Sequence, residues 1–172
     1  MRCRRHAAFA ALSVFSILCA SAAASDSAPR IGPDSHQPVP RFVSLKSAGA
    51  NGRHGPGLEF KVDWIYERAD LPLQVTAESG RWRRVRDPDG AEVWMFAANL
   101  EERRTVYVKT QDDVALRDAP QPDAHIVAYL APGVVGALTG CDTSWRRVAV
   151  GGRVGWVEAG AIWGADPSCA AS

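Results

Sequence analysis

Two stretches of this chain repeat each other at a spacing of about 60 residues, and this repeat limits the possible folds more than any other feature. The corresponding segments follow in the same order: residues 53–56 match 117–120, residues 82–85 match 145–148, and residues 93–95 match 155–157. The middle pair reads Trp-Arg-Arg-Val in both copies. The pattern predicts two units of one architecture in tandem, over residues 41–104 and 105–164.

Each unit contains short runs rich in β-branched and aromatic residues, separated by turn residues, which is typical of an all-β fold. No window keeps a helical period over three turns. Gly151 and Gly152, between two such runs, predict a tight hairpin. The predicted strands are residues 61–66, 73–77, 82–86 and 92–96, then 114–117, 126–130, 134–138, 145–150 and 153–158. Short strands this closely spaced favour a small barrel, because closure removes exposed sheet edges.

The first unit resembles the bacterial SH3-like domain found in exported bacterial proteins. The resemblance rests on residues 51–57, 80–85, 90–95 and 99–100, which follow the family's order of an Arg-x-Gly-Pro-Gly loop, a Gly-x-Trp-x-x-Val strand, a Gly-turn-Trp strand and a final Leu. The second unit matches less closely, because residues 119–121 replace Gly-Pro-Gly with Ala-Pro-Gln. The resemblance implies two small SH3-like barrels in tandem.

Two core positions depart from this family pattern. Gly52 stands where the family has a core leucine, and Val93 stands where it has a turn glycine. A missing buried leucine costs about 2–5 kcal/mol unless neighbouring side chains fill the space. We expect either that a nearby Phe or Trp fills it or that the first barrel is more dynamic.

The spacing within the repeated Trp-Arg-Arg-Val segment does not fit simple strand alternation. Trp82 and Val85 are three residues apart, which places them on opposite faces of a regular strand. Trp145 and Val148 repeat this spacing. Either the tryptophan lies half-exposed at the mouth of a turn, or a bulge shifts the register.

The N-terminus has the three parts of a secretory signal peptide: basic residues 1–6, an apolar run over 7–20, and small residues at 21–25. A membrane span needs about 20 apolar residues, and the run over residues 7–20 is shorter than that. We therefore interpret residues 1–24 as a cleaved signal peptide. The alternative, an amphipathic helix of the folded part, does not fit a run that no charge interrupts. We therefore expect an exported protein, periplasmic or extracellular. Pro-rich residues 25–40 predict a flexible leader, and residues 165–172 a short tail.

Charge argues against nucleic acid as a partner. The chain has a net charge of +1, and the predicted signal peptide removes three arginines and no acidic residue, which leaves −2. No later segment is apolar enough to span a membrane.

Two cysteines, Cys141 and Cys169, remain after the predicted cleavage. In an exported chain such a pair favours an intramolecular disulfide, which in the chain-entropy model stabilises by about 3–4 kcal/mol. Two free thiols and an intermolecular bridge are the alternatives.

The sequence offers no catalytic constellation. His36, His54 and His125 are isolated, and the chain has no His-x-x-x-His or Cys-x-x-Cys motif to hold a metal. The remaining cysteines fall in a predicted loop and in the tail, and the acidic pairs at 101–102 and 112–113 resemble solvated turns. We expect a protein that is not an enzyme and that uses no cofactor and no metal.

Aromatic residues are the main binding candidates. The chain has six tryptophans, more than two small cores need, so some are expected to line a groove. The candidate ligand-binding residues are Trp64, Tyr66 and Trp94 in the first unit and Tyr129 and Trp156 in the second. The alternative is that each packs in a core or between the barrels.

A cluster of arginines beside Trp82 and Trp145 is a second candidate for ligand contact. Guanidinium groups suit the carboxylates of a peptide or a partner protein, whereas the alternative is a solvated strand edge that prevents sheet-to-sheet aggregation. The cluster consists of Arg81, Arg83, Arg84, Arg86, Arg146 and Arg147.

Two functions remain after a hydrolase is set aside. One is a module that binds peptidoglycan peptides or another cell-envelope component, which the family resemblance implies. The other is a protein-interaction or structural adaptor, in which rigidly packed barrels present one surface. Residues 105–109 join the units without Gly or Pro, which favours a direct and rigid connection.

Overall fold

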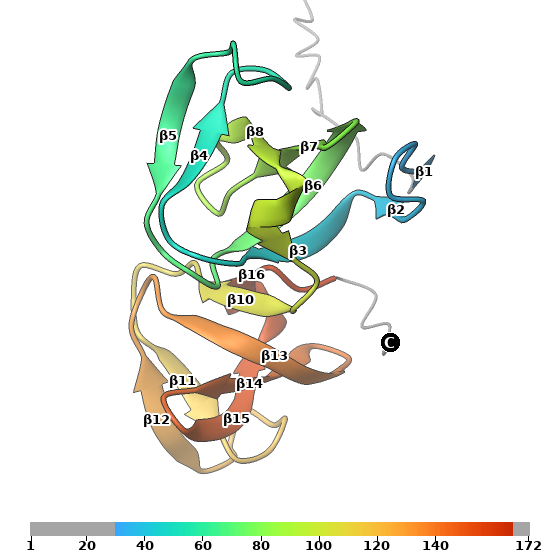
Figure 1. Cartoon of the computed structure of the whole chain (residues 1–172). Coiled ribbons are helices and arrows are strands. Elements are labelled where there is room, and N and C mark those ends of the chain that lie inside the picture. Colours follow the sequence, from blue (N-terminus) through green and yellow to red (C-terminus); the bar gives the residue numbers. More distant parts are fainter. Residues whose placement is uncertain (1–29, 167–172) are drawn as a thin grey trace, which may run out of the picture.

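The computed structural model describes residues 30–166, and it consists of two small antiparallel β-barrels stacked end to end (Figure 1). The predicted signal peptide, the first residues of the predicted leader and Cys169 lie outside the described residues. Within the described part, no helix is long and apolar enough to cross a membrane.

The first barrel is one seven-stranded sheet whose strand order is β5-β4-β8-β7-β6-β3-β9. A single turn of 3-10 helix, η1 (Ala97–Asn99), separates β8 from β9 along the chain. The strands are β3 (Arg41–Leu45), β4 (Ala50–Arg53), β5 (Val62–Tyr66), β6 (Pro72–Ser79), β7 (Trp82–Arg86), β8 (Glu92–Phe96) and β9 (Leu100–Glu101).

The second barrel repeats this topology strand for strand, with the order β12-β11-β15-β14-β13-β10-β16. Its 3-10 turn is η2 (Ala159–Ala161). The strands are β10 (Thr105–Val108), β11 (Val114–Arg117), β12 (Ile126–Leu130), β13 (Val135–Asp142), β14 (Trp145–Val150), β15 (Arg153–Glu158) and β16 (Ile162–Trp163). The all-β class and the tandem barrels are therefore confirmed.

Residues 30–40 differ from the flexible leader that their composition predicts. They form a hairpin of β1 (Arg30–Ile31) and β2 (Pro38–Val39), and Val39 is buried in the core of the first barrel. The reason is a buried carboxylate. Glu78 accepts hydrogen bonds from the Ser35 hydroxyl (2.6 Å) and from the backbone amides of Ser35 (3.0 Å) and Asp34 (3.1 Å).

Cationic partners complete the surroundings of Glu78. The Arg41 guanidinium donates to its carboxylate at 2.9 Å, and the Arg83 guanidinium lies at 3.3 Å. Burial alone raises the pKa of Glu78, but the hydrogen bonds from Ser35, Arg41 and Asp34 outweigh it and lower that pKa to about 2. A stably ionised Glu78 thus fixes the hairpin to the barrel, which a hydrophobicity pattern does not reveal.

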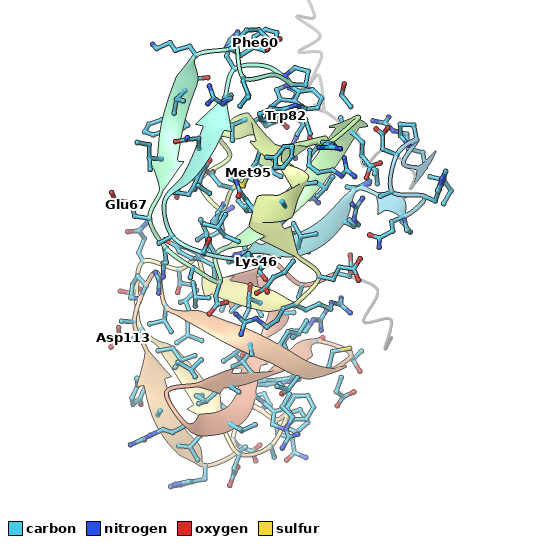
Figure 2. The ribbon with its side chains drawn as sticks, viewed as in Figure 1. Lys46, Phe60, Glu67, Trp82, Met95 and Asp113 are labelled. Atoms are coloured by element: carbon cyan, nitrogen blue, oxygen red, sulfur yellow. The ribbon has the colours of Figure 1, made fainter. Side chains whose placement is uncertain are left out.

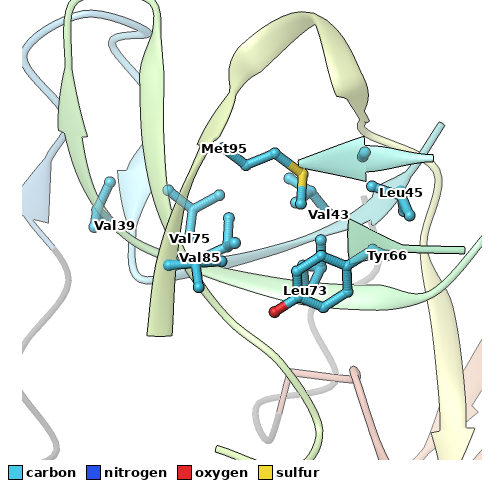
Figure 3. Close-up of a cluster of buried hydrophobic side chains, with 10 residues drawn as sticks. Val39, Val43, Leu45, Tyr66, Leu73, Val75, Val85 and Met95 are labelled. Atoms are coloured by element: carbon cyan, nitrogen blue, oxygen red, sulfur yellow. The ribbon is translucent and has the colours of Figure 1, made fainter. Parts of the chain in front are cut away.

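Neighbouring side chains fill the space that a leucine at position 52 would occupy in the core of the first barrel. A Cβ atom on Gly52 would lie 2.7 Å from Cγ2 of Val93 and 3.0 Å from Cε2 of Tyr66, so these two side chains fill the space. Figure 3 shows the Tyr66 ring within this cluster of buried side chains. The filling residues are a valine and a tyrosine rather than the expected Phe or Trp.

The second barrel has the large and the small residue at the opposite two positions of this pair. Strand register aligns Gly52 with Leu116 and Val93 with Gly155. Leu116 is fully buried, and a Cβ atom on Gly155 would lie 2.7 Å from its Cγ. The two departures from the family pattern in the first barrel are therefore one compensated exchange of volume between neighbouring strands.

The repeated Trp-Arg-Arg-Val segment places its first arginine, not its tryptophan, beside the valine. Arg83 and Arg146 are buried, on the same strand face as Val85 and Val148. Trp82 is half-buried against Phe96, with ring centroids 5.5 Å apart. The register shift lies on the partner strand, between Val75 and Ala77 and at the equivalent place in β13.

These two buried arginines hold the turn that precedes their strand. Nη1 of Arg83 donates to the carbonyls of Gly80 and Trp82, each at 2.9 Å. Nη1 of Arg146 donates to the carbonyls of Thr143 (3.0 Å) and Trp145 (2.9 Å). Their role in both barrels is structural, because the guanidinium groups satisfy backbone carbonyls.

The barrels contact each other through side chains and backbone. The rings of Phe42 and Trp163 meet edge to face with centroids 5.0 Å apart. The Thr105 hydroxyl donates to the carbonyl of Asp70 at 2.7 Å, and Nη1 of Arg68 donates to the carbonyl of Gly133 at 2.5 Å. β10 follows β9 after a three-residue connection, residues 102–104, so these contacts join the barrels over a short linker.

Candidate functional site

An open groove of about 420 Å³ lies on the first barrel where it meets the second. We call it the junction groove. β5 runs toward the second barrel (Figure 1), and Glu67, which follows β5, lies near the junction of the barrels (Figure 2). The groove is lined by Trp64, Tyr66, Leu71, Asp87, Asp89 and, from the second barrel, Tyr107.

Two predicted ligand residues form one wall of the junction groove. Trp64 and Tyr66 alternate along β5 and so share a strand face. Trp64 has 58% of its surface exposed, although it is the largest apolar side chain of that strand. Tyr66, in contrast, is buried, with only 9% of its surface exposed. The groove therefore has an exposed indole at its rim and a buried phenol as its floor.

The opposite wall is the turn that joins β7 to β8. Its sequence is Asp87-Pro88-Asp89-Gly90, and Gly90 adopts a positive φ of 92°. Proline at the second position and glycine at the left-handed position are what such a turn requires. Oδ1 of Asp87 accepts the backbone amides of Asp89 (3.1 Å) and Ala91 (2.9 Å), which fixes the carboxylate in place.

The junction groove is electrostatically negative. The Tyr66 hydroxyl donates to Oδ2 of Asp87 at 3.0 Å, and burial, together with the negative charges of Asp87 and Asp89, raises the pKa of Tyr66. None of the ion pairs within residues 30–166 involves Asp87 or Asp89. Glu67 and Arg68 also line the groove, and Arg68 is directed to the Gly133 carbonyl.

A second hollow of about 410 Å³ continues from the junction groove onto the second barrel. The two share Asp87, Pro88, Asp89 and Tyr107, and the second extends to Lys109 and Trp163. A ligand in the junction groove can therefore reach both barrels.

The other predicted ligand residues lie elsewhere. Trp94 and Trp156 occupy equivalent positions on β8 and β15, half-buried, and neither lines the junction groove. Tyr129 is 63% exposed on β12, at the position of Ile65, and its barrel has Ala128 and Leu130 where the first has Trp64 and Tyr66. The structure thus brings together two of the five candidates.

Residues that the sequence interpretation missed complete the site: Asp87, Asp89 and Tyr107. The Asp-Pro-Asp-Gly segment was available as a turn signal, but its place opposite β5 depends on the order of strands in the barrel. Tyr107 comes from the other barrel, and no sequence pattern places it there.

Most of the arginine cluster has partners within the protein. Arg84 and Arg86 both pair with Glu92, and Nε of Arg86 lies 3.0 Å from Oε1 of that residue. Arg83 and Arg146 are buried, as described above. These four residues do not line the junction groove.

A third hollow of about 720 Å³ lies on the second barrel beside Trp145 and Ile162. Its lining includes Ala165, close to the C-terminal limit of the described residues, and none of the five predicted ligand residues. In the part of the chain that the structure describes, no three His, Cys, Asp or Glu side chains gather in a way that could hold a metal ion.

Cys141 lies on β13 rather than in the loop that the sequence suggested. It is half-buried opposite Arg146, and strand register aligns it with Glu78 of the first barrel. Its disulfide with Cys169 stays a prediction, because Cys169 lies outside residues 30–166.

Comparison with solved structures finds, among other matches, two proteins of Trichomonas vaginalis. NlpC2 is 15% identical over 72% of this chain and 48% of its own, with a TM-score of 0.33. NlpC1 is 16% identical over 77% of this chain and 48% of its own, also with a TM-score of 0.33. The chain spans about half the length of these proteins, and TM-scores this low support no conclusion about function.

No curated protein matches the chain. The bacterial SH3 domain family matches it twice, at residues 46–102 and at residues 110–164, one match in each barrel. These matches confirm the resemblance and the repeat. The chain belongs to the bacterial SH3 domain family and carries two copies of the domain in tandem.

Proposed function

We propose that this protein is an exported, non-catalytic module that binds peptidoglycan peptides through the junction groove. The observation that carries the proposal is the exposure of Trp64 above a groove that fixed polar groups line. Exposed indole and buried phenol groups at a concave surface are typical of binding sites. Membership in the bacterial SH3 family and the N-terminal signal pattern support a ligand in the cell envelope.

Co-sedimentation with purified peptidoglycan sacculi, in moderate salt, tests the proposal. The protein is the chain without the predicted signal peptide, residues 25–172. We expect binding that Trp64→Ala weakens by about tenfold, the effect of losing about 1.4 kcal/mol of contact energy. Tyr129→Ala is the matched control, because Tyr129 is similarly exposed but lies on the other barrel.

Two results would count against the proposal. If the unaltered protein stays in the supernatant, the ligand is not in the sacculus. If Tyr129→Ala and Trp64→Ala weaken binding equally, the junction groove is not the site. Circular dichroism of each variant shows that the loss is not one of folding.

An adaptor for another envelope protein is the second candidate. The contacts between the barrels favour it, because Phe42–Trp163 packing and the Thr105–Asp70 hydrogen bond hold the two surfaces together. A crosslinking pull-down from the envelope, in which Trp64→Ala loses one specific protein while binding to sacculi is absent, would support this candidate instead.

A further inference from the structure

The chemistry of the junction groove narrows its ligand. We propose that it binds an ammonium group carried by a peptidoglycan peptide, with the charge held at Asp89 and Asp87 and the aliphatic stem lying on Trp64. This inference rests on the proposed function and adds the chemical class of the group that is recognised.

The first observation is that two carboxylates in the groove have no ion-pair partner. Asp87 and Asp89 project from one turn, and none of the ion pairs within residues 30–166 involves either of them. Elsewhere in the first barrel, Glu78, Glu92 and Glu101 each pair with an arginine. A cation in the junction groove would give the two aspartates an ion-pair partner of the kind that these three glutamates have.

The second observation is that Asp87 is held in position before any ligand arrives. Both of its carboxylate oxygens accept hydrogen bonds, from two backbone amides and from the Tyr66 hydroxyl. A fixed carboxylate loses little conformational entropy on binding, which is the advantage of a preformed site. Asp89 is exposed beside it, so its carboxylate is accessible to a ligand.

The third observation is the aromatic surroundings of these carboxylates. Trp64, Tyr66 and Tyr107 line the same groove. Aromatic faces attract cations, and they also pack well against an aliphatic stem. An anionic or a purely apolar ligand would satisfy only one of the two kinds of wall.

The remaining charged groups near the groove do not cancel its negative character. Glu67 and Arg68 both line it, so their charges offset each other, and Arg68 also donates to the Gly133 carbonyl. Lys109 lies in the adjoining hollow on the second barrel, where it suits a carboxylate of the same ligand.

The second barrel shows what the same fold looks like without these features. Register aligns Val150 with Asp87 and Arg153 with Ala91, and the turn between them is Gly151–Gly152. Nη1 of Arg153 donates to the Val127 carbonyl at 2.8 Å, and Ala128 and Leu130 of β12 occupy the positions of Trp64 and Tyr66. The fold itself therefore requires neither the carboxylates nor the aromatic wall. Their combination in the first barrel belongs to the junction groove and not to the requirements of the fold.

The test compares untreated sacculi with sacculi whose amines have been acetylated, which turns each ammonium group into a neutral amide. The protein is again residues 25–172. Asp89→Asn is the informative variant, because Asp89 is exposed and asparagine suits the same turn position. Asp123→Asn removes a carboxylate that is also exposed, from a loop of the second barrel, and is the matched control.

We expect acetylation and Asp89→Asn each to weaken binding by about tenfold, the usual size of a lost charge-assisted contact, and Asp123→Asn to leave it unchanged. Equal binding to acetylated and untreated sacculi would overturn the inference and leave the proposed function standing. Sensitivity to acetylation without sensitivity to Asp89→Asn would place the ammonium elsewhere and also overturn it. No binding to untreated sacculi would refute both.

Discussion

The exchange of volume between Gly52 and Val93 predicts a strong coupling between two single substitutions. Val93→Gly removes a side chain that is only 2% exposed, and Gly52→Leu adds one where a Cβ atom already meets Val93 at 2.7 Å. Each change alone should destabilise the first barrel. Together they recreate the arrangement that Leu116 and Gly155 have in the second barrel.

The expected sizes follow from burial and fit. Val93→Gly should cost about 3 kcal/mol, because it removes a buried valine side chain and adds a glycine within a strand. Gly52→Leu should cost about 1–3 kcal/mol through overpacking. The double variant should be more stable than the sum by about 2 kcal/mol, within the range for residues in contact. Recovery is partial, because Tyr66 also closes on Gly52.

Hydrogen exchange measured by NMR resolves the effect by barrel. The amides of Val75 and Val85 report on the first barrel, and those of Val148 and Val157 serve as an internal control in the second. We expect exchange in the first barrel to quicken in each single variant and to slow again in the double variant. Costs that simply add, within about 0.5 kcal/mol, would refute the account of the core.

Three further predictions concern the hairpin, the disulfide and the junction of the barrels. Because the pKa of Glu78 is lowered to about 2 from 4.5, its stabilising effect is present above pH 4.5 and is lost as the pH falls toward 2. The melting temperature of Glu78→Gln should therefore depend less on pH in that range, and an unchanged pH dependence would contradict this role. If Cys141 and Cys169 are bridged, reductant should lower the melting temperature, because the disulfide stabilises the folded protein by about 3–4 kcal/mol. Two titratable thiols in the native protein would exclude the bridge. Trp163→Ala removes the edge-to-face contact with Phe42, so small-angle scattering should show a wider spread of barrel orientations, and an unchanged profile would mean that the linker alone sets them.

The repeat and the turn residues were enough to predict the fold. The matched Trp-Arg-Arg-Val segments and the Gly151–Gly152 hairpin follow from local patterns that the structure confirms. Five barrel strands were not among the predicted ones: β3, β4, β9, β10 and β16. Of these, Ala-Asn-Gly-Arg in β4 has weak strand propensity, and β4 forms through pairing with β5 and β8. The hairpin at residues 30–40 was missed because Val39 is its one residue in the core cluster, and because the hydrogen bonds that hold it to Glu78 join residues 43 positions apart.

The candidate site was predictable only in part, for a physical reason. Trp64 and Tyr66 could be selected because the chain has more tryptophans than two small cores need, and aromatic residues beyond the core suit a groove. The carboxylates opposite them are contributed by a turn more than 20 residues later, and Tyr107 by the other barrel. These residues meet only through the barrel topology and the packing of the two barrels, which a single sequence does not specify.

NMR shift mapping with soluble peptidoglycan fragments tests the central claim most directly. Isotope-labelled protein, residues 25–172, is titrated with fragments released from sacculi by a glycan-cleaving enzyme. We predict concentration-dependent shifts of the Trp64 indole and of the amides of Asp89 and Tyr107, with little change at Tyr129. Shifts confined to the second barrel, or none at fragment concentrations in the millimolar range, would contradict the assignment of the junction groove as the binding site.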